Sequence, residues 1–291
     1  MTVTASAVVD RVQLGDHVCW AHDDERDARD AVTRFTATGL RLGHKVICFT
    51  DTFTPVVVRA NLEDTGVPTQ TAVAVGQLRI VPAMESYVRH LPGGRLAIGA
   101  MLESLAGEVA RAQREGYPGL RLVGDMTWVA RTGTGLDDLT RYEAQANRFF
   151  LDRRVAGMCL YDRRLFPPER LRAVSAAHPA TIGPYADREW TPLLRAYRTA
   201  DPPGLRLVGE ADQSNRDAFA AVLEALNGQG VAGRPAVLDL SGLSFADVRA
   251  ATALVRADRA AAAGLRLVGC RPALIRLLGL VRESESAGWT A

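Results

Sequence analysis

The 291-residue sequence lacks several features that would assign it quickly to a class of protein. Its cysteines are Cys19, Cys48, Cys159 and Cys270, and no two of them form a CxxC pair, so neither a disulfide framework nor a metal site is expected. No run approaches 18 uncharged apolar residues, which argues against a transmembrane helix. The start of the chain has no basic segment and no long apolar core, unlike a signal peptide. A cytoplasmic protein without membrane contact is therefore expected.

An excess of charge of one sign is also missing. The chain has 35 Lys and Arg residues against 33 Asp and Glu, a formal net charge of +2, and its basic residues are mostly scattered arginines. A surface that binds nucleic acid usually requires a large basic excess, so nucleic acid is not expected as a partner. The hydrophobic content of 47% is ordinary for a globular protein that buries a core without disulfides or metals.

Short apolar runs alternate with amphipathic segments over the first 180 residues. The runs predict strands and the segments predict helices. Because each strand is followed by a helix, we expect a parallel sheet in a three-layer α/β domain. Asp23 or Asp24 is expected to cap the first helix. The predicted strands are 17–21, 45–50, 78–81, 120–124 and 155–161, and the predicted helices are 28–40, 56–62, 99–115, 136–151 and 168–177.

Proline and glycine residues between 178 and 204 interrupt this pattern, and a smaller α/β pattern follows. We therefore expect domains at 1–180 and 204–291, joined by a linker at 181–203. The same six letters, GLRLVG, occur at 119–124, 204–209 and 264–269, and each copy is interpreted as a buried strand between glycines. The predicted strands of the second pattern are 205–209, 236–240 and 265–268, and its predicted helices are 215–226, 247–262 and 272–280.

Three motifs of the second pattern indicate a family. They are GEAD at 209–212, VLDLSGLSFAD at 237–247, and the last GLRLVG before a helix. In this order they resemble the STAS domain of bacterial anti-sigma-factor antagonists and of sulfate-transporter tails. The resemblance implies that this domain binds an anti-sigma factor or another regulatory protein. The alternative is a scaffold or dimerisation module.

The STAS resemblance also implies a phosphorylated Ser or Thr directly after Asp247, but Val248 stands there and has no hydroxyl group. Phosphorylation therefore cannot operate the switch at this residue. We expect Ser241 to lie where a strand ends and the chain turns, and Asp247 to accept backbone N–H groups at a helix start. The expected partner-binding residues are Asp212, Ser241, Ser244, Asp247, Val248 and Arg249.

The first domain carries GDHVCW at 15–20, GDMTW at 124–128 and CLYD at 159–162, with Glu143 and Asn147 one helical turn apart before the last motif. In this order they resemble the MEDS (methanogen/methylotroph sensory) domain, which occurs in regulators proposed to respond to small molecules. Such domains are commonly joined to output domains. The resemblance implies a small-molecule sensor fused to a STAS domain.

The order of strands and helices is also similar to that of RecA- and KaiC-type ATPases, whose first loop is the P-loop GxxxxGK[ST]. The corresponding loop here, 21–27 (AHDDERD), contains neither Gly nor Lys and carries four carboxylates, which would repel phosphates. We therefore expect a RecA/KaiC-like domain that has lost its P-loop, and no enzyme. A degenerate nucleotide-binding or hydrolytic enzyme, using His17 or His22 with Asp125 and Glu143, stays as the alternative.

Ligands of open parallel sheets bind beyond the carboxyl ends of the strands. Aromatic and polar residues near such ends suit a small organic molecule. His17 and Cys19 share one strand face, and a soft metal or haem there is the alternative to a buried core position; no cofactor is otherwise expected. Core packing, capping or ion pairing are alternatives for the others. The expected ligand-binding residues are His17, Cys19, Trp20, His22, Asp125, Trp128, Glu143 and Tyr161.

The leading hypothesis is a non-enzymatic regulator that senses a small molecule and switches protein partners. Its oligomeric state is left open, with a homodimer as the candidate assembly. A ligand-free scaffold is a further alternative. A thiol redox sensor requires Cys19, Cys48 and Cys159 to lie on neighbouring strands. Burial without an adjacent cation would raise the pKa of these thiols and make them inert.

Overall fold

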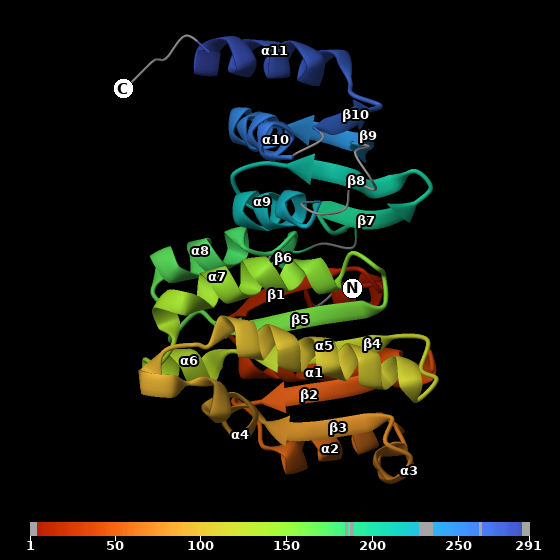
Figure 1. The fold of residues 1–291 in the computed structure, drawn as a ribbon. Coiled ribbons are helices and arrows are strands. Elements are labelled where there is room, and N and C mark those ends of the chain that lie inside the picture. Colours follow the sequence, from red (N-terminus) through yellow and green to blue (C-terminus); the bar gives the residue numbers. More distant parts are fainter. Residues whose placement is uncertain (1–4, 184–185, 187–188, 227–234, 262–263, 287–291) are drawn as a thin grey trace.

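The computed structural model describes residues 5–183, 186, 189–226, 235–261 and 264–286. Six strands form one parallel sheet in the order β3-β2-β4-β5-β1-β6 (Figure 1). The predicted parallel α/β domain is confirmed, because each crossover between these strands carries a helix, as parallel pairing requires. The strands are β1 (His17–His22), β2 (Lys45–Thr50), β3 (Leu78–Pro82), β4 (Leu120–Asp125), β5 (Val155–Asp162) and β6 (Ala180–Ile182).

Helices cover both faces of this sheet, so that its strands are buried on two sides. One face packs against η1 (Ala5–Arg11), α1 (Glu25–Arg41), α2 (Pro55–Asp64) and α3 (Thr69–Ala74). The other face packs against α4 (Ala83–Tyr87), α5 (Ile98–Arg114), α6 (Thr127–Thr132), α7 (Leu136–Ala146) and α8 (Pro168–Ala176), and the short turns η2 (Val88–His90), η3 (Pro92–Gly94) and η4 (Asn147–Phe149) join them. Asp24 is the N-cap of α1, and its carboxylate accepts the backbone N–H of Arg26.

A second sheet, in the order β10-β9-β8-β7, forms the C-terminal part of the chain. Strands β7 and β8, the first two along the chain, form an antiparallel hairpin. β9 pairs in parallel with β8 and with β10. Leucines and other apolar residues on the helices and strands form a core of their own, which Leu151 of the first domain joins. The elements are β7 (Leu194–Ala200), β8 (Pro203–Ala211), α9 (Arg216–Glu224), β9 (Ala236–Ala246), α10 (Val248–Ala260), β10 (Leu265–Val268) and α11 (Pro272–Ser286).

The C-terminal sheet differs from the sequence-based expectation in two places. Ser241 does not lie at a turn, because β9 continues through Ala246 and pairs with β8 across two register shifts. The third GLRLVG copy is an edge strand, β10, whose residues are only partly buried or exposed. An edge strand has a partner on one side only, which the sequence of the strand does not reveal.

The segment 181–203, expected to be a linker, contains regular structure. β6 extends into it and adds a strand to the first sheet beside β1, and β7 supplies the outer strand of the second sheet. Trp190 donates its indole N–H to the Thr181 carbonyl at 3.0 Å. The sequence did not reveal this strand because the prolines and glycines of the segment indicated a linker. The strand 194–200 is short, and its residues alternate between more and less buried positions.

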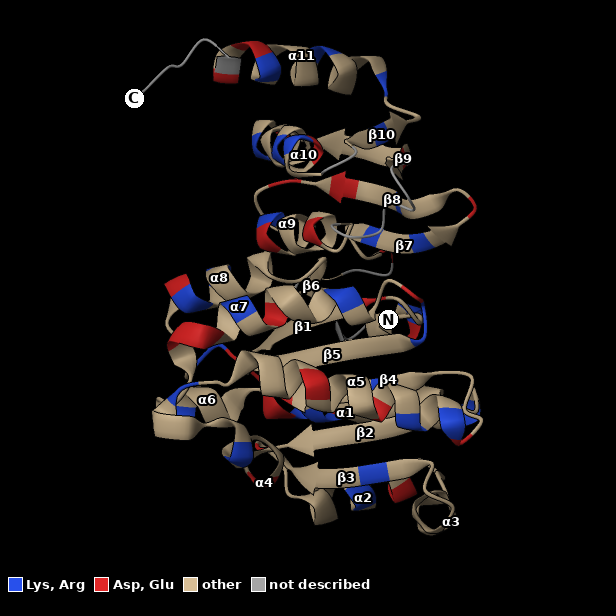
Figure 2. Cartoon of the chain, in the orientation of Figure 1, with Lys and Arg blue, Asp and Glu red and all other residues tan. Residues whose placement is uncertain are grey.

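The two sheet domains contact each other through polar and helical packing. Asp16, just before β1, accepts two hydrogen bonds from the Arg195 guanidinium on β7, at 2.7 and 2.8 Å. Helix α9 packs against α7 and η4, next to β1 and β5 (Figure 1). Acidic and basic residues are interspersed along the helices and loops of both domains (Figure 2). No helix among the described residues is long and apolar enough to cross a membrane.

Candidate functional site

Two neighbouring strands, one helix and the segment between α8 and β6 bring four chemically reactive side chains together on one face of the first sheet. His17 begins β1, and Cys159 lies on β5, which pairs with β1. Glu143 projects from α7, and His178 lies between α8 and β6. All four are buried or nearly so, and their ligand atoms lie within 4.8 Å of one another. We call these four residues the His–Glu–Cys cluster.

The glycine at position 157 makes room for the first of these side chains. His17 stacks on Phe150, with ring centroids 4.4 Å apart and planes inclined by 7°. A Cβ atom at Gly157 would lie 2.8 Å from the Phe150 ring and 3.2 Å from the His17 ring. Since both contacts are shorter than ordinary packing distances, a residue without a side chain is needed here for the stacked His17 and Phe150 rings to keep their places.

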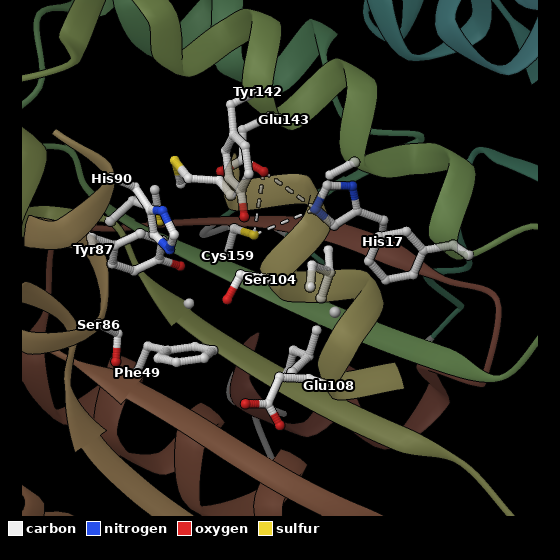
Figure 3. Close-up of a pocket in the computed structure, with 18 of the residues that line it drawn as sticks. His17, Phe49, Ser86, Tyr87, His90, Ser104, Glu108, Tyr142, Glu143 and Cys159 are labelled. Carbon is white, nitrogen blue, oxygen red and sulfur yellow. Dashed lines mark hydrogen bonds and ion pairs between the residues drawn. The ribbon is translucent and has the colours of Figure 1, made fainter. Parts of the chain in front are cut away.

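Polar contacts within the cluster converge on the Glu143 carboxylate (Figure 3). Its Oε2 atom lies 3.4 Å from His17 Nε2, 3.6 Å from His178 Nε2 and 3.7 Å from Cys159 Sγ. Its Oε1 atom accepts a hydrogen bond of 2.6 Å from the Tyr161 hydroxyl. His17 Nε2 also lies 3.4 Å from Cys159 Sγ. The polar ends of the cluster therefore meet at one point.

A second layer of hydrogen bonds holds the two imidazole rings. His17 Nδ1 lies 3.0 Å from Asn147 Oδ1, and His178 Nδ1 lies 2.7 Å from the Val174 carbonyl. The Asn147 amide nitrogen donates to three backbone carbonyls, including that of Ala177 at 2.8 Å, so its oxygen must face His17. Both rings thus donate through Nδ1, and each presents Nε2 to the cluster.

Burial and charge shift the ionisation of the cluster. Burial, followed by the nearby Glu143 charge, raises the pKa of the Cys159 thiol well above its usual range. Burial, followed by neighbouring His17, lowers the pKa of His178 to about 4. For Glu143, burial raises the pKa, but the opposing effects of His17, His178 and Tyr161 outweigh it and leave the pKa low. The Cys159 thiol, which contacts His17 and Glu143, is therefore not an activated nucleophile.

A cavity of about 80 Å³ opens beside the cluster, between the sheet and helices α5 and α7 (Figure 3). Aromatic rings form much of its wall, and polar groups stand at several places. Two of these are the His–Glu–Cys cluster and the ion pair between Arg79 and Glu108, 2.6 Å apart. The lining includes His17, Phe49, Ser86, Tyr87, His90, Ser104, Tyr142, Glu143, Phe150 and Cys159.

Some of the predicted ligand-binding residues gather at this cavity. His17 and Glu143 line it, and Tyr161 holds Glu143 from behind. Cys19 lies opposite Cys159 on the paired strand, with its thiol 3.8 Å from the Ser175 hydroxyl. Trp128 is fully buried and stacks on the wall residue Tyr87, with ring centroids 5.1 Å apart. It supports the wall without lining the cavity.

The other predicted residues lie elsewhere. Trp20 packs in the core on the opposite face of the sheet. Asp125 stands at the carboxyl end of β4, where its carboxylate accepts the backbone N–H groups of Asp51, Thr52 and Thr127. His22 ends β1 and is buried without a hydrogen-bond partner for either ring nitrogen. The cavity thus lies against the sheet face, and none of these three residues lines it.

The cysteines do not form one group. Cys19 and Cys159 face each other on β1 and β5, but Cys48 packs on the other face against α1, beside the Thr36 hydroxyl. Burial raises the pKa of Cys19 to about 12 and that of Cys48 to about 11. These thiols therefore carry almost no thiolate near neutral pH. A redox sensor requires a thiolate, so these cysteines do not suit that role.

Sequence reasoning did not assign a ligand role to His178 or Cys159. His178 was treated as part of a helix-breaking segment, and Cys159 as a motif residue or one of the buried thiols. The spacing of Glu143 and Asn147 on one helix face was the available signal, since it places both side chains toward the same neighbour. His178 carried no such signal, because it comes from an irregular segment.

The predicted partner-binding residues lie on β9, just after β8 and at the start of α10. Asp247 is its N-cap and accepts the Ala250 N–H at 2.7 Å. Ser241, Ser244, Val248 and Arg249 are exposed, and Asp212 is partly buried beside Ser214. Phe245, which was not predicted, is 50% exposed and lies next to Asp247 in the chain. Asp212, Phe245 and Asp247 also line a groove that reaches the first domain.

Comparison with known proteins gives a family for both parts of the chain. Residues 16–179 match the model of the methanogen/methylotroph, DcmR sensory domain (MEDS), and residues 195–282 match a STAS domain model described as Mlab, STAS domain. A search of curated proteins found no match to the chain. Both matched families have sensory or regulatory roles, in agreement with a signalling protein. The chain belongs to the MEDS sensory-domain family, with a STAS domain following the sensory domain.

Proposed function

We propose that the chain is a non-enzymatic signalling regulator whose MEDS domain binds a small organic molecule and whose STAS domain binds a regulatory protein such as an anti-sigma factor. The observation that carries this proposal is the cavity beside the His–Glu–Cys cluster, with aromatic walls and converging polar groups. Such a combination is typical of sites that bind small molecules.

The size of the cavity limits the ligand. A water molecule needs roughly 10–15 Å³ of such space, so a cavity of about 80 Å³ holds a molecule of a few non-hydrogen atoms. A porphyrin is far larger, which disfavours haem. Arg79 Nε and Glu108 Oε2 are buried without hydrogen-bond partners and add a donor and an acceptor near the cavity. A small molecule with an apolar body and one or two polar groups suits this environment.

The contacts between the domains supply a route for coupling. Helix α7 carries Glu143 at the cavity and packs against α9 of the STAS domain. Asp16, next to His17, binds Arg195 of β7. A ligand that displaces α7 or the start of β1 would change contacts with the STAS domain, and so favour one arrangement of the two domains. Because Val248 cannot be phosphorylated, this coupling would replace phosphorylation as the control of partner binding.

We expect a stabilising ligand from a screen of small polar organic molecules to lose its effect when Ala146 is replaced by Leu. Ala146 is buried on α7 and lines the cavity, so the larger side chain fills ligand space. A ligand at 100 times its Kd stabilises the wild-type chain by about 2.7 kcal/mol. Thermal shift and calorimetric titration of the full chain measure this effect.

Ala112→Leu is the matched control, because Ala112 is equally buried on α5 but belongs to another core cluster. Both substitutions overpack the core and are expected to lower the free energy of unfolding by a similar amount, about 1–3 kcal/mol. Equal ligand binding by the Ala146→Leu variant and the wild type would contradict binding in this cavity. A screen in which no compound stabilises the wild-type chain would contradict the sensing role.

For the STAS domain, we expect Val248→Asp to weaken capture of the partner protein by about tenfold or more. Val248 is 61% exposed at the start of α10, and a carboxylate there places charge where an apolar contact is expected. Quantitative pull-down with the full chain as bait compares the proteins retained by each variant. Leu280→Asp is the control, since Leu280 is 64% exposed on the distant helix α11. Equal retention by the wild type and Val248→Asp would place the partner surface elsewhere.

A further inference from the structure

The His–Glu–Cys cluster has the composition of a metal site. It combines two imidazoles, one carboxylate and one thiol, which are the side chains that bind zinc in proteins. They come from β1, α7, β5 and the segment before β6, and none of them reaches the solvent freely. Groups of this kind are seldom buried together without a compensating charge, because each is costly to remove from water.

The spacing of the ligand atoms matches tetrahedral coordination. Ligands at the usual zinc distances of 2.0–2.3 Å lie roughly 3.3–3.8 Å from one another in a tetrahedron. The contacts that Glu143 Oε2 makes with the other ligand atoms, and that of His17 Nε2 with Cys159 Sγ, range from 3.4 to 3.7 Å. The remaining two pairs lie within 4.8 Å, so one ion at the centre would reach all four atoms once these wider pairs close to tetrahedral spacing.

The hydrogen bonds outside the cluster present the correct atoms. Metal-binding imidazoles usually donate their other N–H to a carbonyl or carboxylate oxygen, which fixes the ring orientation. His17 does this to Asn147 and His178 to the Val174 carbonyl. Tyr161 donates to the Glu143 oxygen that faces away from the other ligands. His17, His178 and Glu143 therefore each turn an unprotonated atom toward the centre of the cluster.

An independent observation is the unpartnered nitrogen of His178. The residue is fully buried, and its Nε2 atom has no hydrogen-bond partner although it is aimed at the cluster. A proton on His17 would form an ion pair with Glu143 but would leave His178 Nε2 unsatisfied. A second imidazolium beside the first would be repelled by it. A single cation satisfies both nitrogens and the carboxylate together.

We propose that His17, Glu143, Cys159 and His178 bind one divalent transition-metal ion, with Zn²⁺ the ion that best suits this mixed nitrogen, oxygen and sulfur set. Cys159 binds as the thiolate, and its proton passes to solvent on metal binding. Asn147 and Tyr161 are positioning residues. Because three of the ligands line the cavity, the metal forms one end of the proposed ligand site, but its binding does not depend on the sensing role.

The first test measures the metal content of the full chain, purified without an affinity tag that binds metal. Elemental mass spectrometry is expected to find about one transition-metal ion per chain. X-ray absorption at the edge of the bound metal is expected to show one sulfur neighbour and otherwise nitrogen or oxygen. A chain that neither retains nor takes up Zn²⁺ or Co²⁺ overturns the proposal, and so does a bound metal with no sulfur neighbour.

Variants then locate the ion. Loading the metal-free chain with Co²⁺ is expected to give a sulfur-to-cobalt charge-transfer band, which Cys159→Ser abolishes. His178→Gln tests a ligand, and Asn147→Ala tests a positioning residue. Asn147→Ala is expected to lower the affinity for the metal roughly 10–100-fold. Cys48→Ser is the control, because Cys48 is a buried thiol on the opposite face of the sheet. Unchanged Co²⁺ spectra and affinity in Cys159→Ser and His178→Gln overturn the assignment.

These measurements separate the metal site from the sensing role. A chain that binds the metal but no small molecule keeps the metal site and contradicts sensing. A variant that fails to fold is recognised by circular dichroism, and the sulfur neighbour in the wild-type absorption spectrum then decides the question without it.

Discussion

Asp16→Ala is expected to lower the free energy of unfolding by about 3 kcal/mol, the lower end of the range for breaking a buried ion pair. Asp16 is 3% exposed and forms two short hydrogen bonds with the Arg195 guanidinium, which is left without its partner in the variant. The lower end applies because a fifth of the Arg195 side chain reaches solvent, at 21% exposure. Urea unfolding monitored by fluorescence and circular dichroism measures the loss.

The same variant tests whether this ion pair couples the domains. Arg195 is on β7 of the STAS domain and Asp16 precedes β1 of the MEDS domain, so the variant is expected to unfold in two separate transitions. Asp152→Ala is the control, because Asp152 pairs with Arg198 across the same boundary but is 55% exposed. Exposed pairs contribute about 0–1 kcal/mol. Equal losses in the two variants would contradict the importance of the buried pair.

Gly209→Ala is expected to destabilise the STAS domain by roughly 3 kcal/mol or more, or to prevent its folding. Gly209 has a φ of +104°, which strains residues with a side chain. A Cβ atom there would lie 2.1 Å from the Leu193 carbonyl oxygen, a backbone atom that cannot move away alone. This close approach explains the glycine of the GEAD motif, where β8 passes the start of β7.

Gly279→Ala is the matched control for this substitution. Gly279 lies within α11 with open space around its Cα atom, so the added methyl group meets nothing. Alanine in a helix interior is favoured over glycine by about 0.5–1 kcal/mol, and a small gain in stability is expected. Thermal unfolding of both variants shows the opposite signs. A Gly209→Ala variant as stable as the wild type would contradict the proposed strain.

Local patterns predicted most of the regular elements of this chain. The apolar runs at 45–50 and 120–124 became strands of a parallel sheet. Asp24 caps α1 and Asp247 caps α10. These features depend on residues a few positions apart, so the sequence reveals them directly. Short helices such as α6 and the outer strand β7 were missed, because neighbouring elements stabilise them more than their own sequence does.

The candidate site was only partly predictable. Family motifs indicated His17, Glu143 and Tyr161, and the structure brings these three together. The same reasoning grouped them with Trp20 and Asp125, which lie on the opposite face and at the strand end. Alternation along a strand predicts which residues share a face, but it does not say which face meets which helix.

By itself, the sequence determined the family of each domain, the order of strands and helices, and the absence of a phosphorylatable hydroxyl at Val248. Only the tertiary structure decided that β5 lies beside β1 and that α7 and the segment before β6 complete the cluster. Cys159 and His178 thereby meet His17, which is more than 140 positions away in the chain. Strand order and register are set by the packing of the whole sheet, and no local pattern encodes contacts over such separations.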